Sequence, residues 1–561
     1  MTGKWCKFGQ NKLIIAEFIA IILVVIFSLF LFLKTEKNST DHEDEKNTTS
    51  ENAEIPYHEE GALYVGYDGD LGSLDITRNY SSYVVAYNVY DRLFEIKKED
   101  NGEFSLISNI LKNYTVSADK RTYNFELKDG IKFSNGDILS SEDVEFTFIR
   151  SIKADSGNKL ADAIEGADDF IANKTDKLSG FKVYDEKRFS ITLKKPFPSY
   201  LWQLTLPAYS ILNKESVEEG DSLFGKDAEF SIGSGAYCID KWNDEEKILK
   251  LNPNYWGEEP SVKKVYLKRY IPIRMDLAFR TGEIDYLVME DFNKEIYRKY
   301  YTNNKEYRFI YTDCLDNCML IMNSDKPLLS DKRVRRAIQL GIDRQAIIEE
   351  ALDGNAVSVD GIFPKGLMGY TEDNQGWLKY DPEEAKKLIN EVGDCSDFKL
   401  EIGITPNLGI KGVQKISNMI AEDLKNIGLR VSVVRYDADS RIYLRSNNKL
   451  TLSYVHWVAD TNDPDNFLFD FFSSPEKAHN FSLGTIDENI MKRVVEARYI
   501  VNDEERLKEY ASIEKKLVEE DAVLLPIYSE KRIFVIGNRI KNLTPSWSGA
   551  SSIRFRDIEL K

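Results

Sequence analysis

The chain has 561 residues, more than one compact core usually holds, so two or three domains are expected. Its 42% hydrophobic and 12% aromatic residues are typical of an ordinary globular protein. The formal net charge of -18 argues against nucleic-acid binding by phosphate neutralisation, because that mode needs clustered lysine and arginine.

The N-terminal region predicts a membrane anchor. Leu13–Leu33 is a nearly continuous apolar run, interrupted by Glu17 and Ser28. It is about as long as a helix needs to be to cross a bilayer. Lysines precede the run and acidic residues follow it. By the positive-inside rule, the N-terminus is therefore expected in the cytoplasm and the rest of the chain outside.

A cleaved secretory signal and a lipoprotein signal are the alternatives to a membrane anchor for this run. A cleaved secretory signal would end in small residues, whereas Leu29–Leu33 reads LFLFL and Lys34 follows; this alternative stays open. A lipoprotein would need a cysteine just after the run, and Cys6 lies before it. We predict a cytoplasmic N-terminus and uncleaved signal anchor in residues 1–34. A disordered acidic stalk is predicted in residues 35–61, whose polar composition cannot form a core.

The first folded elements are predicted from hydrophobic periodicity. Ala62–Tyr67 reads as a strand, and Ser81–Phe94 has near-helical spacing of its apolar residues. Tyr123–Phe133 alternates and contains a Lys-Asp-Gly turn, which predicts a hairpin. Ser140 and Ser141, followed by two acidic residues, predict the start of a helix.

The segment Ser231–Trp256 predicts a second hairpin. A Gly-Ser-Gly-Ala-Tyr turn leads into a strand that ends at Trp242. A charged tip precedes the strand Ile248–Leu251, and Asn-Pro-Asn-Tyr-Trp closes the unit.

The second half of the chain alternates helices and strands. Asp331–Ala351 is predicted as a helix with one apolar side, and Gln414–Ile427 as another, closed by Gly428. The strand Arg430–Val434 follows directly. This order of elements indicates an α/β domain.

Catalytic and metal-binding motifs are missing from the sequence. It contains no GxSxG, HExxH or Walker A pattern, so no enzyme and no cofactor are expected. Asp460, Asp463 and Asp465 resemble a calcium loop but lack its glycine and terminal glutamate. Cys314 and Cys318 allow a local disulfide, although two idle thiols fit as well. Because the histidines lie far from the cysteines in sequence, no metal site is predicted.

Several blocks of sequence together resemble the solute-binding proteins of peptide-type ABC importers, the oligopeptide/dipeptide-binding family (family 5). The similarity runs from about Ala62 to the C-terminus. The blocks, which occur in the family order, are Leu127–Arg150, Ser231–Trp256, Arg274–Leu287, Asp331–Ile348, Ile420–Val433 and His456–Leu468.

This resemblance implies an α/β, type II periplasmic-binding-protein fold. Two lobes joined by a hinge would close on a ligand, and a third domain would be inserted early in the chain. The expected division is lobe I in residues 62–94, 231–309 and 524–561, inserted domain II in residues 95–230, and lobe III in residues 310–523.

The resemblance also suggests binding residues. An Asp after a Trp-x-Ala motif pairs with the α-ammonium of a bound peptide in such proteins, and Trp457, Val458, Ala459 and Asp460 match this pattern. A buried carboxylate needs a cationic partner, and an ammonium supplies one. The alternative for Asp460 is a structural cap on the following turn.

Further contacts are expected on both sides of the ligand. Trp457 and the strand Leu450–Val455 would offer backbone hydrogen bonds to an extended peptide. The loop that contains Asn79, Tyr80 and Ser81 would flank the peptide from lobe I. The group that binds the peptide carboxylate is not identified, with Tyr454 and His456 as the nearest candidates.

The resemblance implies an extracellular protein, expected to be a monomer, that captures oligopeptides and delivers them to an ABC transporter permease, and the predicted signal anchor would tether it to the membrane. Two alternatives remain open: a membrane-tethered peptide sensor, and a binder of another solute such as an oligosaccharide. Nickel binding is disfavoured because histidine and cysteine do not cluster in the sequence.

Overall fold

The computed structural model describes residues 58–77, 83–99, 103–153, 163–289, 300–301, 304–395, 397–405, 412–545 and 553–561. The predicted anchor and nearly all of the predicted stalk lie outside these residues. Within them, no helix has both the length and the apolar character required to cross a membrane.

The central feature is a sheet of twelve strands in the described part of the chain, whose main path runs β16-β15-β17-β13-β18-β11-β1-β10-β9-β8. β12 and β14 also pair with β18. The strands are β1 (Ala62–Tyr67), β8 (Tyr237–Trp242), β9 (Lys247–Leu251), β10 (Lys264–Arg269), β11 (Tyr286–Met289), β12 (Arg308–Asp313), β13 (Asp316–Met322), β14 (Ala356–Ser358), β15 (Lys399–Ile404), β16 (Arg430–Arg435), β17 (Leu452–Val458) and β18 (Leu524–Ile536).

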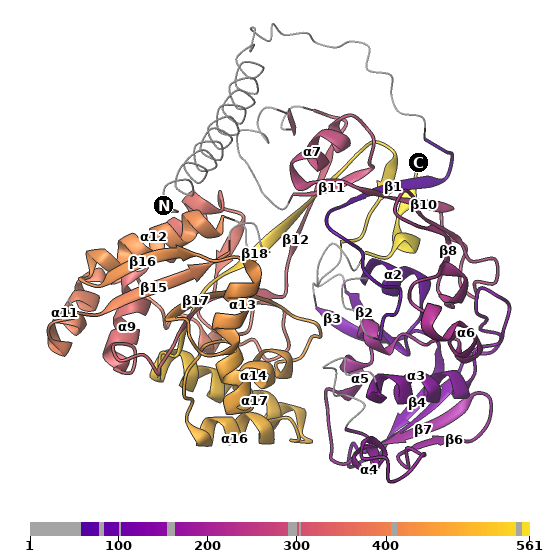
Figure 1. Cartoon of the computed structure of the whole chain (residues 1–561), viewed down its shortest axis with the longest axis horizontal. Coiled ribbons are helices and arrows are strands. Elements are labelled where there is room, and N and C mark those ends of the chain that lie inside the picture. Colours follow the sequence, from indigo (N-terminus) through magenta and orange to yellow (C-terminus); the bar gives the residue numbers. More distant parts are fainter. Residues whose placement is uncertain are drawn as a thin grey trace, which may run out of the picture. The chain divides into compact units, whose positions relative to one another are not determined.

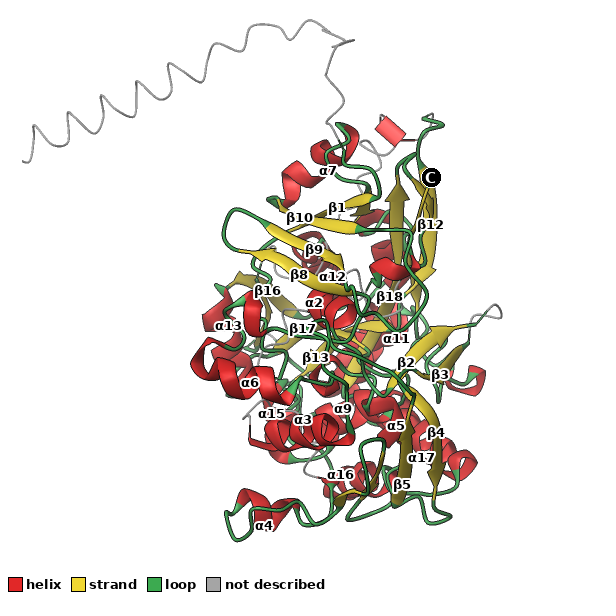
Figure 2. Ribbon diagram, turned by 90° about the vertical axis from the view of Figure 1, so that its right-hand side faces the viewer, coloured by secondary structure: helices red, strands yellow, loops and turns green. Residues whose placement is uncertain are grey.

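The long strand β18 joins the two halves of this sheet (Figure 1). Its first residues, from Leu524 to Tyr528, pair with β13, and its last, from Ile533 to Ile536, pair with β11. β8, β9, β10 and β1 lie side by side beyond β11 (Figure 2). A single continuous strand therefore links the part around β13 and β17 with the part around β1.

Smaller sheets lie outside this path. β4, β5, β7 and β6 form a four-stranded sheet, while β2 pairs with β3 and β19 with β20. These strands are β2 (Phe94–Lys98), β3 (Phe104–Ser108), β4 (Leu111–Val116), β5 (Thr122–Leu127), β6 (Phe181–Val183), β7 (Arg188–Thr192), β19 (Ile540–Asn542) and β20 (Glu559–Leu560).

Helices accompany each sheet. In the first half of the chain they are α2 (Tyr83–Val89), α3 (Ser141–Lys153), α4 (Ala167–Ile171), α5 (Tyr200–Gln203), α6 (Lys214–Gly220) and α7 (Pro272–Arg280). In the second half they are α9 (Lys332–Gly341), α10 (Arg344–Ala346), α11 (Pro382–Val392), α12 (Val413–Asn426), α13 (Ala438–Ser446), α14 (Asp465–Phe472), α15 (Pro475–Asn480), α16 (Glu488–Ala497) and α17 (Asp503–Lys515).

Three large apolar clusters form the cores. One draws its buried residues from Leu315 to Tyr528, and a second from Leu93 to Ile211. The third combines β1, α2 and β8–β10 with the C-terminal segment that includes Phe534 and Phe555. The exact borders of the three predicted domains remain a prediction, since β18 contributes to more than one core.

Two predicted elements differ from the structure. The hairpin over Tyr123–Phe133 is wrong, because β5 pairs with β4 and β7 and the chain after Leu127 leaves the sheet. The helix predicted over Asp331–Ala351 is interrupted at Ile342, where the backbone is extended. Asp343 then caps α10 by accepting a hydrogen bond from the amide of Ala346 at 2.9 Å.

Candidate functional site

The predicted motif begins at the end of β17. The indole Nε1 of Trp457 donates to the carbonyl oxygen of Asn466 at 3.1 Å, and its ring packs edge-on against Phe471 and Phe481. The amide of Ala459 donates to the carbonyl oxygen of Leu315 at 2.7 Å. These contacts fix the chain immediately before Asp460.

Asp460 lies in the loop between β17 and α14, and its side chain is half-buried. Its backbone amide donates to Oδ1 of Asn466 at 3.0 Å. Burial raises the pKa of Asp460 to about 6, and the nearby charge of Asp470 adds to the shift. Among the described residues, no lysine, arginine or histidine forms an ion pair with Asp460. The loop therefore holds a poorly solvated carboxylate that has no cationic partner in the part of the chain that the structure describes.

Tyr87 of α2 lies near this carboxylate. Burial raises the pKa of the Tyr87 hydroxyl; the charge of Arg92 opposes the shift and that of Asp460 adds to it. The Arg92 guanidinium lies over the Tyr87 ring, 4.5 Å from its centre. Asp460 and Tyr87 come from different halves of the large sheet assembly, so the fold places α2 opposite the predicted motif.

A small pocket of about 60 Å³ lies beside Tyr87. Its lining is strongly charged and includes Arg92, Glu95, Lys98 and Arg554. Glu95 is an ion-pair partner of both Arg92 and Arg554. Larger surface hollows of about 410 and 430 Å³ lie elsewhere, on the β4–β7 sheet and beside α13. Neither Tyr87 nor this pocket could be predicted from a sequence motif, because the residues that line the pocket come from distant parts of the chain.

The other predicted residues of β17 have internal contacts. Tyr454 is fully buried, and its carbonyl oxygen accepts a hydrogen bond from Nη2 of Arg441 at 2.6 Å. Ala459 is buried and Val458 is half-buried. Asn79, Tyr80 and Ser81 lie outside the described residues. Contact of these residues with a ligand remains a prediction.

β17 is fully paired along one edge and only partly paired along the other. β13 pairs with it from Leu452 to Val458, whereas β15 pairs only with Leu452 and Ser453. In the predicted stretch, Leu450–Val455, β15 therefore occupies Leu452 and Ser453 but not Tyr454 and Val455. The later stretch from Tyr454 to Val458 is the part of β17 that β15 does not reach.

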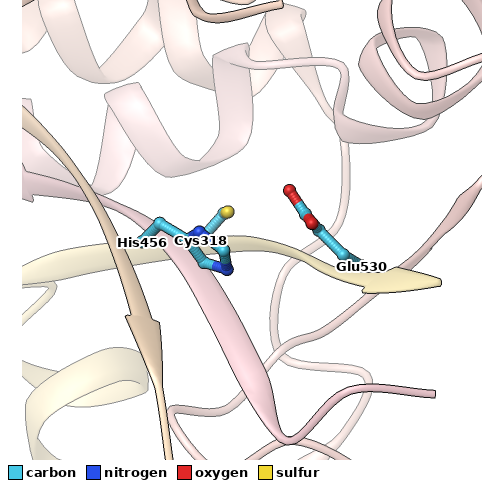
Figure 3. A group of neighbouring side chains, drawn as sticks. All are labelled: Cys318, His456 and Glu530. Atoms are coloured by element: carbon cyan, nitrogen blue, oxygen red, sulfur yellow. The ribbon is translucent and has the colours of Figure 1, made fainter. Parts of the chain in front are cut away.

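His456 contacts an acidic neighbour. Its Nε2 lies 2.9 Å from Oδ2 of Asp316, the first residue of β13. The fold also brings His456 together with Cys318 and Glu530 (Figure 3). The expectation that histidine and cysteine do not cluster is thus wrong in three dimensions, because neighbouring strands place residues far apart in sequence side by side.

Two of the three acidic residues that resemble a calcium loop form ion pairs within the protein. Both guanidinium Nη atoms of Arg506 donate to Asp463, at 3.0 and 2.8 Å, and Arg498 pairs with Asp465 at 2.8 Å. These carboxylates support the loop from within. Cys314 and Cys318 are both free thiols, so the local disulfide does not form.

Comparison with known proteins gives a consistent result. The model of the bacterial extracellular solute-binding proteins, family 5 (middle region), matches residues 105–479. Di/tripeptide-binding protein 2 of Pseudomonas aeruginosa is 25% identical over 416 residues, covering 70% of this chain and 74% of that protein.

Two solved structures share the fold. The DppA protein of Helicobacter pylori, in complex with the peptide STSA, has a TM-score of 0.71 and 23% identity, covering 89% of this chain and 98% of its own. NikA of Brucella suis, in complex with Fe(III)-EDTA, has a TM-score of 0.77 and 20% identity, covering 89% and 100%. The expected α/β periplasmic-binding-protein fold is confirmed, and the chain belongs to the bacterial extracellular solute-binding proteins of family 5.

Proposed function

We propose that this protein captures oligopeptides that have a free amino terminus and delivers them to an ABC transporter permease. The observation that carries the proposal is Asp460, a half-buried carboxylate that lacks a cationic partner among the described residues. A peptide α-ammonium would supply the missing charge and a strong, charge-assisted hydrogen bond. The peptide-binding relatives support the same class of ligand.

The neighbouring groups fit an extended ligand. The stretch of β17 from Tyr454 to Val458, beyond the reach of β15, supplies backbone groups for a peptide strand. Tyr87 would close over the amino terminus from the opposite side, and Asn79, Tyr80 and Ser81 would flank the chain. Because the backbone contacts ignore side-chain identity, selectivity for sequence would be low.

The ligand class can be tested with matched peptides. A peptide with a free amino terminus should raise the melting temperature of the protein, because it binds the folded state. The N-acetylated form of the same peptide should bind far more weakly, since it leaves Asp460 unpaired. Equal affinities would contradict the proposal and favour a different solute, with oligosaccharides tested next.

We also propose that residues 13–33 tether the protein to the cell membrane. The support is the apolar run itself, flanked by lysines on its N-terminal side. The full-length protein should sediment with membranes and keep its first residues, whereas a chain that starts at residue 35 should be a soluble monomer. An N-terminal sequence that begins after Leu33 would show that the run is a cleaved signal.

A further inference from the structure

We propose that Cys318, His456 and Glu530 form a binding site for a divalent transition metal of the zinc type. One ligand atom from each of these side chains lies within 4.8 Å of the others (Figure 3). This inference goes beyond the capture of a solute and does not depend on the peptide proposal.

The pairing of three strands creates the cluster. Cys318 on β13 lies directly opposite His456 on β17, so their side chains project from the same face of the sheet. Cys318 also lies opposite Tyr528 on β18, and Glu530 follows two residues later on that face. The site therefore rests on three neighbouring strands of the large sheet rather than on a loop.

The donor atoms select the metal. A thiolate, an imidazole and a carboxylate are together typical of zinc, whereas calcium and magnesium prefer oxygen alone. Ligand atoms around a tetrahedral zinc lie roughly 3.5 Å apart, given bond lengths of about 2.0–2.3 Å. Small side-chain rotations would close the present separations. Three protein ligands leave a fourth position for water or a solute group.

The surroundings support a metal rather than a chance meeting. Cys318 is fully buried and Glu530 is 5% exposed, while the His456 side chain is 12% exposed. Asp316 contacts His456 Nε2 at 2.9 Å, the kind of carboxylate–histidine pair that orients a metal-bound imidazole. The other carboxylate oxygen of Asp316 accepts from the backbone amide of Glu530 at 2.9 Å, so it stays fixed between two of the ligands.

Binding must displace the thiol proton of Cys318. Burial and the charges of Glu530 and Asp316 hold the pKa of this thiol well above its usual range, so the metal-free protein carries a neutral thiol. A cation among these groups reverses the electrostatics and stabilises the thiolate. Metal affinity should accordingly rise with pH.

The experiment uses Co²⁺ as a spectroscopic probe of the purified full-length protein. One equivalent of Co²⁺ should produce a sulfur-to-cobalt charge-transfer absorption in the near-ultraviolet and visible d–d bands of a four-coordinate ion. Zn²⁺ should displace the Co²⁺ and abolish both the charge-transfer absorption and the d–d bands. Cys318→Ser should remove the charge-transfer absorption, and His456→Gln should lower the affinity at least tenfold.

Cys314→Ser is the matched control, because Cys314 is also a buried free thiol close by in sequence. It should bind Co²⁺ with the wild-type spectrum. Absence of the charge-transfer absorption in the wild type would overturn the proposal without any variant. Persistence of this absorption at full intensity in Cys318→Ser would also overturn it. If Cys318→Ser fails to fold, an unchanged Co²⁺ affinity in His456→Gln would do so.

Discussion

At the scale of single residues, the proposed pairing of Asp460 with a peptide ammonium can be tested by one substitution. Asp460→Asn keeps the shape of the side chain and removes the proposed partner of the ammonium. Loss of one member of such a buried pair typically costs about 2–5 kcal/mol, or roughly thirty-fold to several-thousand-fold in affinity. Calorimetric titration with a free-amine peptide measures this. Asp439→Asn, an exposed residue on α13, is the control and should bind like the wild type.

The raised pKa of Asp460 also predicts that the ionised carboxylate destabilises the ligand-free protein, although the same charge is expected to favour peptide binding. Its pKa of about 6 in the folded protein exceeds the usual value of 3.8 for an aspartate, so the folded state binds this proton more tightly than the unfolded state. Stability should therefore fall as pH rises from about 4 to about 6. The penalty above pH 6 is at most about 3 kcal/mol, and less because the side chain is only half-buried.

Without ligand, Asp460→Asn should consequently be more stable than the wild type at pH 7.5, and equally stable near pH 3.5. Urea unfolding at both pH values checks this. Peptide affinity of the wild type should decrease as pH falls below about 6, since a neutral carboxyl no longer attracts the ammonium. A variant that is less stable at pH 7.5 would identify Asp460 as a structural cap.

At the scale of elements, local patterns predicted strands and helices but not their partners. The strand Ala62–Tyr67 matches β1, and the helix before Gly428 matches α12, where the positive φ of 97° explains the glycine. The predicted hairpin at Tyr123–Phe133 failed because the partners of β5 lie before and long after it in sequence. Alternation identifies a strand, whereas the choice of partner depends on the packed core.

The loop that carries Asp460 depends on an ion pair from α17. Arg506 and Asp463 form a bidentate pair with side-chain exposures of 2% and 0%. Arg506→Met would leave the Asp463 carboxylate buried and unpaired, which should reduce the free energy of unfolding by about 3–5 kcal/mol. Chemical denaturation measures the loss. Lys508→Met removes an exposed pair on the same helix and should change it by less than about 0.5 kcal/mol.

At the scale of the whole molecule, the sequence pointed to one candidate ligand-binding residue, Asp460, and to none of the groups that the fold brings close to it. The Trp-x-Ala-Asp pattern pointed to Asp460 because its four residues are contiguous. Tyr87 and the cluster of Cys318, His456 and Glu530 could not be predicted, because β13, β17 and β18 come together only in the folded sheet. A site whose residues lie on several strands can be predicted only when the order of those strands in the sheet is known.

Two parts of the molecule that are far apart in sequence, the segment around Phe197 and the segment around Tyr499, are in contact. The Lys195 ammonium lies 4.8 Å from the centre of the Tyr499 ring, and the Arg498 guanidinium lies 4.5 Å from that of Phe197. Lys120 pairs with Asp503 at 3.1 Å, an exposed contact that contributes little. Residues from predicted domain II and predicted lobe III thus meet through cation–π contacts, which would have to break when the two parts separate.

Tyr499→Ala should therefore weaken ligand binding although Tyr499 is not one of the predicted ligand-binding residues. An exposed cation–π contact contributes about 0.5–1 kcal/mol, so the closed arrangement, and with it peptide affinity, should fall roughly two- to five-fold. Calorimetric titration of Tyr499→Ala with the free-amine peptide that is used to test Asp460→Asn measures this loss of affinity. Tyr184→Ala, which removes an exposed ring elsewhere in predicted domain II, should leave affinity unchanged. Equal affinities for both variants and the wild type would mean that the contact between Lys195 and Tyr499 does not help to hold predicted domain II and predicted lobe III together.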